Sequence, residues 1–101
     1  MSQKRDFIFN HLNQGFTIYT KMDEGNGGCP YCEKAKDFLR YDLNQSFTEV
    51  SLTTQERQIM YKIWELEAGT VPMIFFKKGK NVTQIGGYRE LIRFDMKEIL
   101  P

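Results

Sequence analysis

The sequence predicts a single α/β domain over residues 1–101, in which a four-stranded mixed sheet is flanked by helices. Three observations predict it. A length of 101 residues is enough for one compact domain. Strand-type and helix-type segments follow in the order strand, helix, strand, helix, strand, strand, helix. The strand–helix–strand start implies a parallel strand pair, and the short turn at 77–80 implies an antiparallel hairpin.

The first half of the chain supplies two strands and one helix. Residues 16–20 are rich in β-branched and aromatic side chains and indicate a strand. Residues 30–42 indicate a helix, because Pro30 suits a first helical turn. Its apolar residues recur at helical spacing: Tyr31, Ala35, Phe38 and Leu39. Residues 46–52 return to a strand pattern.

The second helix is predicted over residues 55–67. Thr53 or Thr54, followed by Glu56, is typical of a helix start in which the hydroxyl and the carboxylate satisfy the first amides. The apolar face expected for this helix consists of Ile59, Ile63, Trp64 and Leu66.

The last third of the chain predicts a hairpin and a final helix. Residues 73–76 form a short apolar run that suits a buried strand, and 81–85 follow after the turn as a fourth strand. Gly86-Gly87 marks a break, after which 88–100 indicates a helix. The apolar residues of that helix are Leu91, Ile92, Met96, Ile99 and Leu100. At the other end of the chain, residues 1–15 are an extension that could add a short helix over 3–13.

Composition narrows the class of function. The hydrophobic share of 41% and the charged share of 27% are ordinary for a folded domain. A net charge of +1 without a basic stripe gives no reason to expect a nucleic-acid partner. No apolar run approaches the ~18 residues of a membrane span, and the N-terminus does not resemble a signal peptide. We therefore expect a cytoplasmic protein, monomeric by default.

The two cysteines, Cys29 and Cys32, are the only ones in the chain and form a Cys-x-x-Cys motif. The motif stands between a strand with its loop and a helix, so Cys29 is expected at a helix N-terminus. Unpaired amides and the positive end of the helix dipole stabilise a thiolate there, which lowers the thiol pKa. Cys29 is then the nucleophile. Cys32, one helical turn further on, is placed to attack a mixed disulfide formed at Cys29.

Two other interpretations of the pair stay open. The cysteines could be ordinary small apolar residues. A zinc site would need four ligands, and within one chain only His11 is left to help. The strand–loop–helix context favours the redox interpretation, because it is the context expected of such a motif.

A second signal is Thr70-Val71-Pro72, directly before the buried strand at 73–76. Proline cannot donate to a strand ladder, so it belongs at a strand start. If the Val71–Pro72 bond is cis, the backbone N–H and C=O of Val71 are free to hold an extended substrate. Otherwise Pro72 merely begins a strand. Gly86-Gly87 similarly permits close backbone approach of a ligand, or simply a turn.

The ordered set Cys29-Pro30-Tyr31-Cys32, Thr70-Val71-Pro72 and Gly86-Gly87 resembles the glutaredoxin family, from about Phe16 to Leu100. The resemblance implies the thioredoxin fold, a cis proline, and glutathione as the reducing co-substrate, with no metal expected. It implies that Cys29 and Cys32 are catalytic. The residues implied to bind glutathione are Lys21, Tyr31, Thr70, Val71, Pro72, Gly87 and Tyr88.

Two departures from the family pattern stand out. A glycine-rich insertion at 22–28 separates Lys21 from Cys29, where the family has a shorter loop; it is a tolerated surface loop or a docking loop for a partner. Arg89 stands where an acidic residue would meet the amino group of glutathione, so that contact could shift to Glu90 or be lost. Arg57 or Lys62 could supply a cation for a glutathione carboxylate.

The predicted function is a glutathione-dependent thiol–disulfide oxidoreductase acting on protein disulfides and glutathione mixed disulfides. Ribonucleotide reductase is a candidate recipient of its electrons by the same resemblance. Three alternatives remain: a thioredoxin-like redoxin fed by a thioredoxin reductase, a dimer that carries an iron–sulfur cluster, and a redox-inactive adaptor that uses the fold for binding and would have an unreactive Cys29. Pro30 counts against the cluster carrier, by analogy with the family.

Overall fold

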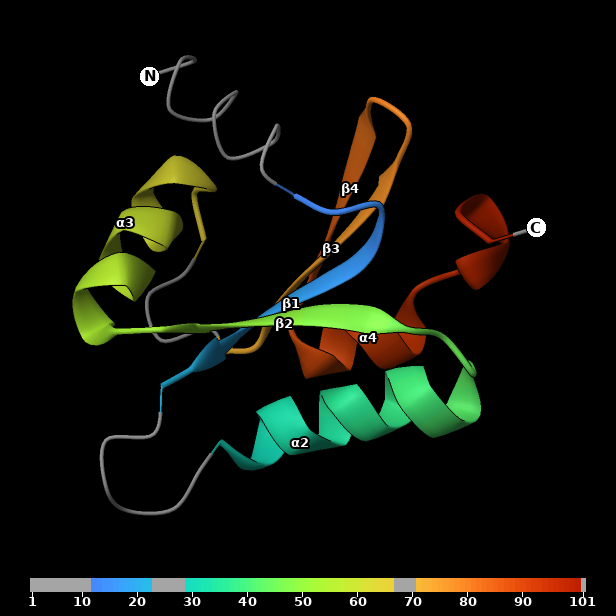
Figure 1. The fold of residues 1–101 in the computed structure, drawn as a ribbon, viewed down its shortest axis with the longest axis horizontal. Coiled ribbons are helices and arrows are strands. Elements are labelled where there is room, and N and C mark those ends of the chain that lie inside the picture. Colours follow the sequence, from blue (N-terminus) through green and yellow to red (C-terminus); the bar gives the residue numbers. More distant parts are fainter. Residues whose placement is uncertain (1–11, 23–28, 67–70, 101) are drawn as a thin grey trace.

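The computed structural model describes residues 12–22, 29–66 and 71–100. Figure 1 shows one mixed sheet with helices on both of its faces. The strands are β1 (Gly15–Lys21), β2 (Phe47–Leu52), β3 (Met73–Lys78) and β4 (Asn81–Gly86). The helices are α2 (Pro30–Asp37), α3 (Thr54–Ile63) and α4 (Tyr88–Arg93), with a π-helical turn η1 (Phe38–Asp42) and a 3-10 turn η2 (Met96–Glu98).

The sheet has the strand order β2-β1-β3-β4. β1 pairs in parallel with β2, whereas β3 is antiparallel to both β1 and β4. This is the arrangement expected from the strand–helix–strand start and the later hairpin, and it is the α/β arrangement of the thioredoxin fold. The predicted mixed four-stranded sheet is therefore confirmed.

Each face of the sheet has its own apolar core. One core joins the sheet to α2 and α4, which pack against each other. Its buried residues include Phe16, Ile18, Ala35, Leu39, Ile74 and Leu91. The other core lies under α3 and includes Leu52, Met60, Tyr61, Trp64, Met73 and Phe75. Because β1 and β3 are covered on both faces, most of their residues are buried.

The α3 core is built around aromatic contacts. Trp64, the only tryptophan of the chain, packs on Phe75 with ring centroids 4.4 Å apart. Tyr19 meets the same phenylalanine edge-on at 5.7 Å. Burial of its hydroxyl raises the pKa of Tyr19. The apolar face predicted for this helix was partly wrong, because Ile59 is 54% exposed while Met60 and Tyr61 are buried in its place.

The start of α3 follows the predicted capping pattern. Thr53 is the N-cap: its hydroxyl accepts the Glu56 N–H at 3.2 Å, while the Glu56 carboxylate accepts the Thr53 N–H at 2.9 Å. These two bonds satisfy amides that would otherwise be unpaired at the helix end.

Of two predicted helices, the first is helical over its whole predicted range but changes type, and the second ends earlier than its apolar spacing indicated. The helix predicted over 30–42 is α-helical to Asp37 and continues as the π-helical turn η1. The helix predicted over 88–100 stops at Arg93, because Phe94 adopts an extended conformation with ψ 137°. η2 follows, capped by the Asp95 carboxylate, and it returns Ile99 to the core. Apolar spacing located Leu91 and Ile99 in the core, but it was wrong for Ile92, which is 44% exposed, and it missed the break at Phe94.

The N-terminal extension predicted over 1–15 is only partly within the described residues. Residues 1–11 lie outside them. Residues 12–14 are not helical, and Gly15 already belongs to β1. Gln14 makes two hydrogen bonds to the backbone of Gly79 in the β3–β4 turn, at 2.8 and 2.9 Å. The approach to β1 is thus fastened to the turn of the hairpin.

We predict that Thr53→Ala lowers the free energy of unfolding by about 1 kcal/mol, because the substitution removes the side-chain acceptor for the Glu56 amide. Urea unfolding monitored by circular dichroism measures this. Thr54→Ala is the matched control: Thr54 is exposed at the first position of the helix, and its hydroxyl accepts a hydrogen bond from the Arg57 side chain at 3.1 Å rather than from a backbone amide, so a smaller loss is expected. An equal loss in the two variants would contradict the capping role.

The same cap predicts a pH dependence. In the folded state, the hydrogen bond from the Thr53 backbone N–H is the largest cause that lowers the pKa of Glu56, and the Thr53 hydroxyl lowers it further. A carboxylate with a lowered pKa stabilises the fold above its unfolded-state pKa, and that stabilisation is lost as the pH falls through its folded-state pKa. The stability difference between wild type and Glu56→Gln should therefore be present at neutral pH and vanish in acid. A difference that persists unchanged in acid would contradict this.

Candidate active site

Four chain segments meet at one end of the sheet. β1 and β4 finish there with Lys21 and Gly86, and β3, antiparallel to both, begins there after Val71-Pro72. α2 starts from the same end with Cys29 as its N-cap (Figure 1). The topology therefore brings together three motifs that are spread over residues 29–87 of the sequence: the cysteine pair, the Val-Pro pair and the glycine pair.

Cys29 and Cys32 form a disulfide across the first turn of α2, with Cα atoms 5.1 Å apart. The Cys29 sulfur also accepts a hydrogen bond from the Cys32 N–H at 3.2 Å, so it acts as the helix cap. Pro30 occupies the first helical turn, where its missing N–H costs no helical hydrogen bond. After reduction, a thiolate at Cys29 would keep this amide donor and face the positive end of the helix.

The two sulfurs differ in access. Cys29 is partly exposed, whereas Cys32 is 3% exposed and packs beneath it. An incoming disulfide can therefore reach Cys29 but not Cys32. The two sulfurs therefore differ in their access to a large substrate; that Cys29 attacks first and Cys32 resolves the mixed disulfide stays a prediction.

Aromatic side chains border the disulfide on the α4 side. Tyr31, 48% exposed, lies with its ring centroid 6.2 Å from that of Tyr88. The Lys34 ammonium stands 5.5 Å from the Tyr31 ring centre. The sequence interpretation had placed Tyr31 on the apolar face of the helix, but the side chain points outward beside the site. Tyr31 and Tyr88 thus lie near each other, and their role in binding glutathione stays a prediction.

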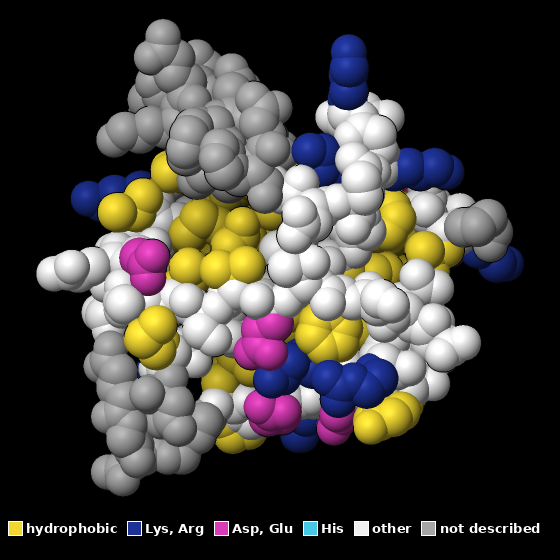
Figure 2. Space-filling view, viewed as in Figure 1, with side chains coloured by type: hydrophobic (Ala, Val, Ile, Leu, Met, Phe, Trp, Pro, Cys, Tyr) yellow, Lys and Arg dark blue, Asp and Glu magenta, His cyan; other side chains and the backbone are white. Residues whose placement is uncertain are grey.

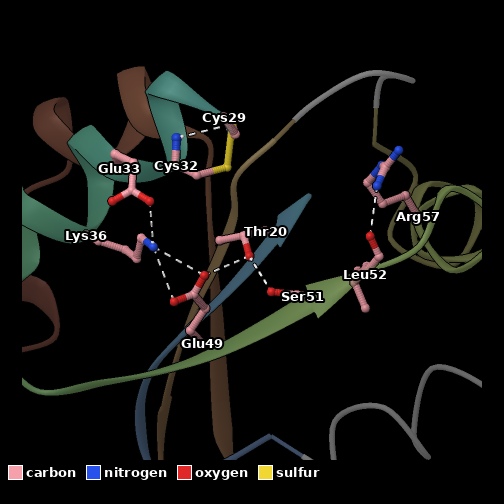
Figure 3. The surroundings of a disulfide bond; sticks show 9 residues. All are labelled: Thr20, Cys29, Cys32, Glu33, Lys36, Glu49, Ser51, Leu52 and Arg57. Atoms are coloured by element: carbon pink, nitrogen blue, oxygen red, sulfur yellow. Dashed lines mark hydrogen bonds and ion pairs between the residues drawn. A yellow bond between two sulfur atoms is a disulfide. The ribbon is translucent and has the colours of Figure 1, made fainter. Parts of the chain in front are cut away.

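The Val71–Pro72 bond is cis, as the resemblance implied. Pro72 is fully buried, and Val71 is partly exposed at the entry to β3. Thr70 lies outside the described residues. Lys21 is exposed at the end of β1 and pairs in register with Leu52. Arg57 donates to the Leu52 carbonyl at 2.8 Å and thereby secures the end of β2 (Figure 3).

Gly86 and Gly87 lie at the same end of the sheet, where β4 ends and α4 begins. Gly86 has a φ of +116°, and Gly87 is the N-cap of α4. The Glu90 carboxylate folds back and accepts the Gly87 N–H at 2.8 Å. A Cβ on Gly86 would lie 2.9 Å from the Glu90 side chain, so the close approach requires glycine. Glu90 therefore already holds an amide of the predicted groove.

Sequence reasoning missed a polar cluster between α2 and the sheet, beside the cysteines (Figure 3). The Lys36 ammonium lies 2.9 Å from Glu33 and 3.3 Å from both carboxylate oxygens of Glu49 on β2. Glu49 also accepts the hydroxyl of Thr20 at 2.9 Å, and Thr20 lies 3.2 Å from Ser51. Two signals in the sequence bear on it: Lys36 follows Cys32 by one helical turn, and Thr20 is a polar residue on the same strand face as the apolar Phe16 and Ile18.

Lys36 remains charged in this setting although its side chain is only 14% exposed. Burial alone would lower the pKa of its ammonium group. Hydrogen bonds to Glu33 and Glu49, together with their negative charges, more than offset burial and raise the pKa of Lys36. The cluster is therefore a fixed cation between two carboxylates.

The described residues contain neither a candidate metal site nor a candidate membrane-spanning helix. In the ranges 12–22, 29–66 and 71–100, no group of three or more histidine, cysteine, aspartate or glutamate side chains could hold a metal ion. Across the same part of the chain, no helix combines the length and apolar character that a membrane crossing requires.

Comparison with known proteins agrees with the geometry. The sequence profile of the glutaredoxin family matches residues 16–82, about two thirds of the chain and inclusive of both cysteines and Pro72. The chain belongs to the glutaredoxin family. This assigns it thiol–disulfide oxidoreductase chemistry and a redox-active cysteine pair. No curated protein and no solved structure gives a significant match.

We predict that Gly86→Ala in this glutaredoxin lowers the free energy of unfolding by about 1 to 2 kcal/mol. Alanine is strained at φ +116°, and its Cβ would overlap Glu90. Combining it with Glu90→Ala removes the contacts with the Glu90 Cγ and carboxylate, but the contact with the Cβ of residue 90 and the backbone strain remain. The double variant should therefore lose less than the sum of the two single losses, as measured by denaturant unfolding. Strict additivity would contradict the overlap.

Proposed function

We propose that this glutaredoxin is a glutathione-dependent oxidoreductase that reduces protein disulfides and glutathione mixed disulfides. The observation that carries the proposal is the difference in access across one helical turn, with Cys29 reachable at the helix N-terminus and Cys32 buried beneath it. This arrangement supports a dithiol exchange in two ordered steps.

In the first step the Cys29 thiolate attacks one sulfur of the substrate disulfide. A bond forms between Cys29 and that sulfur while the substrate S–S bond breaks, and the departing thiolate takes up a proton. The Cys32 amide, which already points at the Cys29 sulfur, and the helix dipole favour the anionic nucleophile. The product is a mixed disulfide at Cys29.

In the second step Cys32 loses its proton and attacks the Cys29 sulfur. The second substrate thiol leaves, and the Cys29–Cys32 disulfide forms, so two electrons have passed to the substrate. Two molecules of glutathione then return the pair to the dithiol state and leave as glutathione disulfide. When the substrate is itself a glutathione mixed disulfide, a second glutathione can resolve Cys29 directly and Cys32 is not needed.

Glutathione is proposed to lie along the Val71 backbone, with Tyr31 and Tyr88 beside its cysteine and Lys21, Thr70 and Pro72 completing the groove. Extended peptides pair with exposed backbone groups in this way. A glutathione carboxylate aimed at the Gly87 amide would compete with Glu90, and Arg89 offers it a nearby cation.

The source of electrons for this protein is the part of the proposal that the experiment must test. Because Glu90 occupies the Gly87 amide, a thioredoxin reductase is the second candidate source of electrons. We further propose ribonucleotide reductase as a candidate recipient of the electrons, the cytoplasm as the compartment, and a monomer as the active form.

The experiment that tests the proposal is turnover of a small glutathione mixed disulfide with glutathione, coupled to glutathione reductase. We predict measurable turnover in the wild type and a loss of at least about a hundredfold in Cys29→Ser, because the nucleophile is removed. Cys32→Ser should retain this activity but lose reduction of protein disulfides, which requires the second thiol.

The outcomes separate the candidates. Full activity of Cys29→Ser would overturn the assigned roles. No turnover with glutathione, together with turnover when thioredoxin reductase is supplied, would replace the reductant but keep the dithiol chemistry. A coloured protein that loses iron and sulfide on acidification would favour the cluster carrier.

A further inference from the structure

The polar cluster between α2 and β2 has no part in the exchange steps above, although it lies beside the cysteine pair in Figure 3. It consists of Glu33, Lys36, Glu49 and Thr20. Lys36 is four residues after Cys32, so the two side chains lie on the same face of α2, one turn apart. Both are largely buried, Cys32 at 3% and the Lys36 side chain at 14% exposed.

The net charge of this cluster is set by three ionised groups. One ammonium, from Lys36, meets two carboxylates, from Glu33 and Glu49, so the cluster carries about one negative charge at neutral pH. Figure 2 shows side chains of both signs gathered over α2 and the neighbouring strand β2. Burial of Lys36 limits the access of water, so the charges are screened less than an exposed pair would be.

The redox state of the cysteine pair changes charge at the same helix end. The disulfide is neutral, whereas the dithiol form carries a thiolate at Cys29 and passes through a thiolate at Cys32 during resolution. A nearby cation therefore stabilises the reduced pair relative to the disulfide, and a nearby carboxylate does the reverse.

We propose that the charges of Lys36 and Glu49 shift the redox equilibrium of the cysteine pair in opposite directions. Lys36 favours the reduced form, and Glu49 favours the disulfide. Neither residue touches the substrate; both act through the sulfur atoms. The inference rests on the dithiol chemistry of the proposed function and is independent of whether glutathione is the reductant.

Thr20 holds the Glu49 carboxylate of this cluster in place. Its hydroxyl, 3% exposed at the end of β1, donates to Glu49 at 2.9 Å and holds the carboxylate against the sheet. Ser51, in register with Thr20 on the neighbouring strand, lies 3.2 Å from the same hydroxyl. Glu49 is thereby kept on the α2 face of β2 rather than turned into solvent.

Other charged groups surround the pair and remain constant in the test. On α2 itself, the other described titratable or charged groups are Tyr31, Lys34 and Asp37. On the elements packed against α2 they are Tyr19 and Lys21 on β1, Arg40, Tyr41 and Asp42 on η1, and Tyr88, Arg89, Glu90 and Arg93 on α4. These groups are the same in the wild type and in the variants. The direction in which the redox equilibrium shifts therefore reports the effect of the cluster alone.

The test compares Lys36→Met with Glu49→Gln in a dithiothreitol redox buffer, with the oxidised fraction measured by thiol trapping. Lys36→Met leaves two unbalanced carboxylates and should shift the equilibrium about three- to tenfold toward the disulfide. Glu49→Gln leaves a balanced pair and should shift it about three- to tenfold toward the dithiol. Glu33→Gln should act in the Glu49→Gln direction but less, because its side chain is 67% exposed.

A second readout follows the reactive thiolate directly. The pH profile of Cys29 alkylation by iodoacetamide should move to higher pH in Lys36→Met and to lower pH in Glu49→Gln. Lys36→Arg should restore the wild-type profile, because it keeps the charge. Denaturant unfolding provides the contrast, since both Lys36→Met and Glu49→Gln break the same ion pair and should lower stability in the same direction.

Matched controls come from the same helical segment. Arg40 and Asp37 form an ion pair at 3.9 Å in which both side chains are more than half exposed, and Arg40→Met and Asp37→Asn should leave the equilibrium within twofold of wild type. Opposite shifts of more than twofold in the two cluster variants support the proposal. Shifts in the same direction, or shifts within twofold, overturn it and leave the cluster as a structural clamp. Because dithiothreitol replaces glutathione, failure here does not bear on the glutathione assay.

Discussion

The placement of β1 in the interior of the sheet is the constraint on which the rest of the structure depends. It pairs with β2 on one side and β3 on the other, and it is covered by α2 and α4 on one face and by α3 on the opposite face. Because β1 is parallel to β2, the chain must cross over between them, and α2 is that crossover. The start of α2 then lies at the end of the sheet where β1 finishes, which puts Cys29 beside the entry to β3.

Much of this could be predicted because local pattern and tertiary structure agree. The strands, the two cysteines at a helix start, the Thr53 cap and the break at Gly86-Gly87 all carry short-range signals, and the structure confirms each of them. The family match adds the cysteine chemistry. What the sequence could not supply were helix ends set by packing. Phe94 turns extended so that Ile99 can return to the core, and no residue near it is a strong helix breaker.

The polar cluster escaped prediction for a different physical reason. Lys36 and Glu49 lie thirteen residues apart on different elements, so no helical or strand periodicity relates them. Each is ordinary by itself: a lysine on a helix with acidic neighbours and a glutamate on an edge strand. Only the register of β1 with β2, which sets Thr20 opposite Ser51, brings the glutamate under the helix. Side chains whose role depends on inter-strand register are in general beyond single-sequence reasoning.

The position of Trp64 gives the molecule a built-in optical reporter. As the only indole of the chain, packed on Phe75 in the α3 layer, it lies on the opposite side of the sheet from the α2 core. Its fluorescence emission therefore reports the packing of the α3 layer, which contains neither of the two cysteines. Measured alongside thiol trapping, it distinguishes a protein that has changed its redox state from one that has begun to unfold.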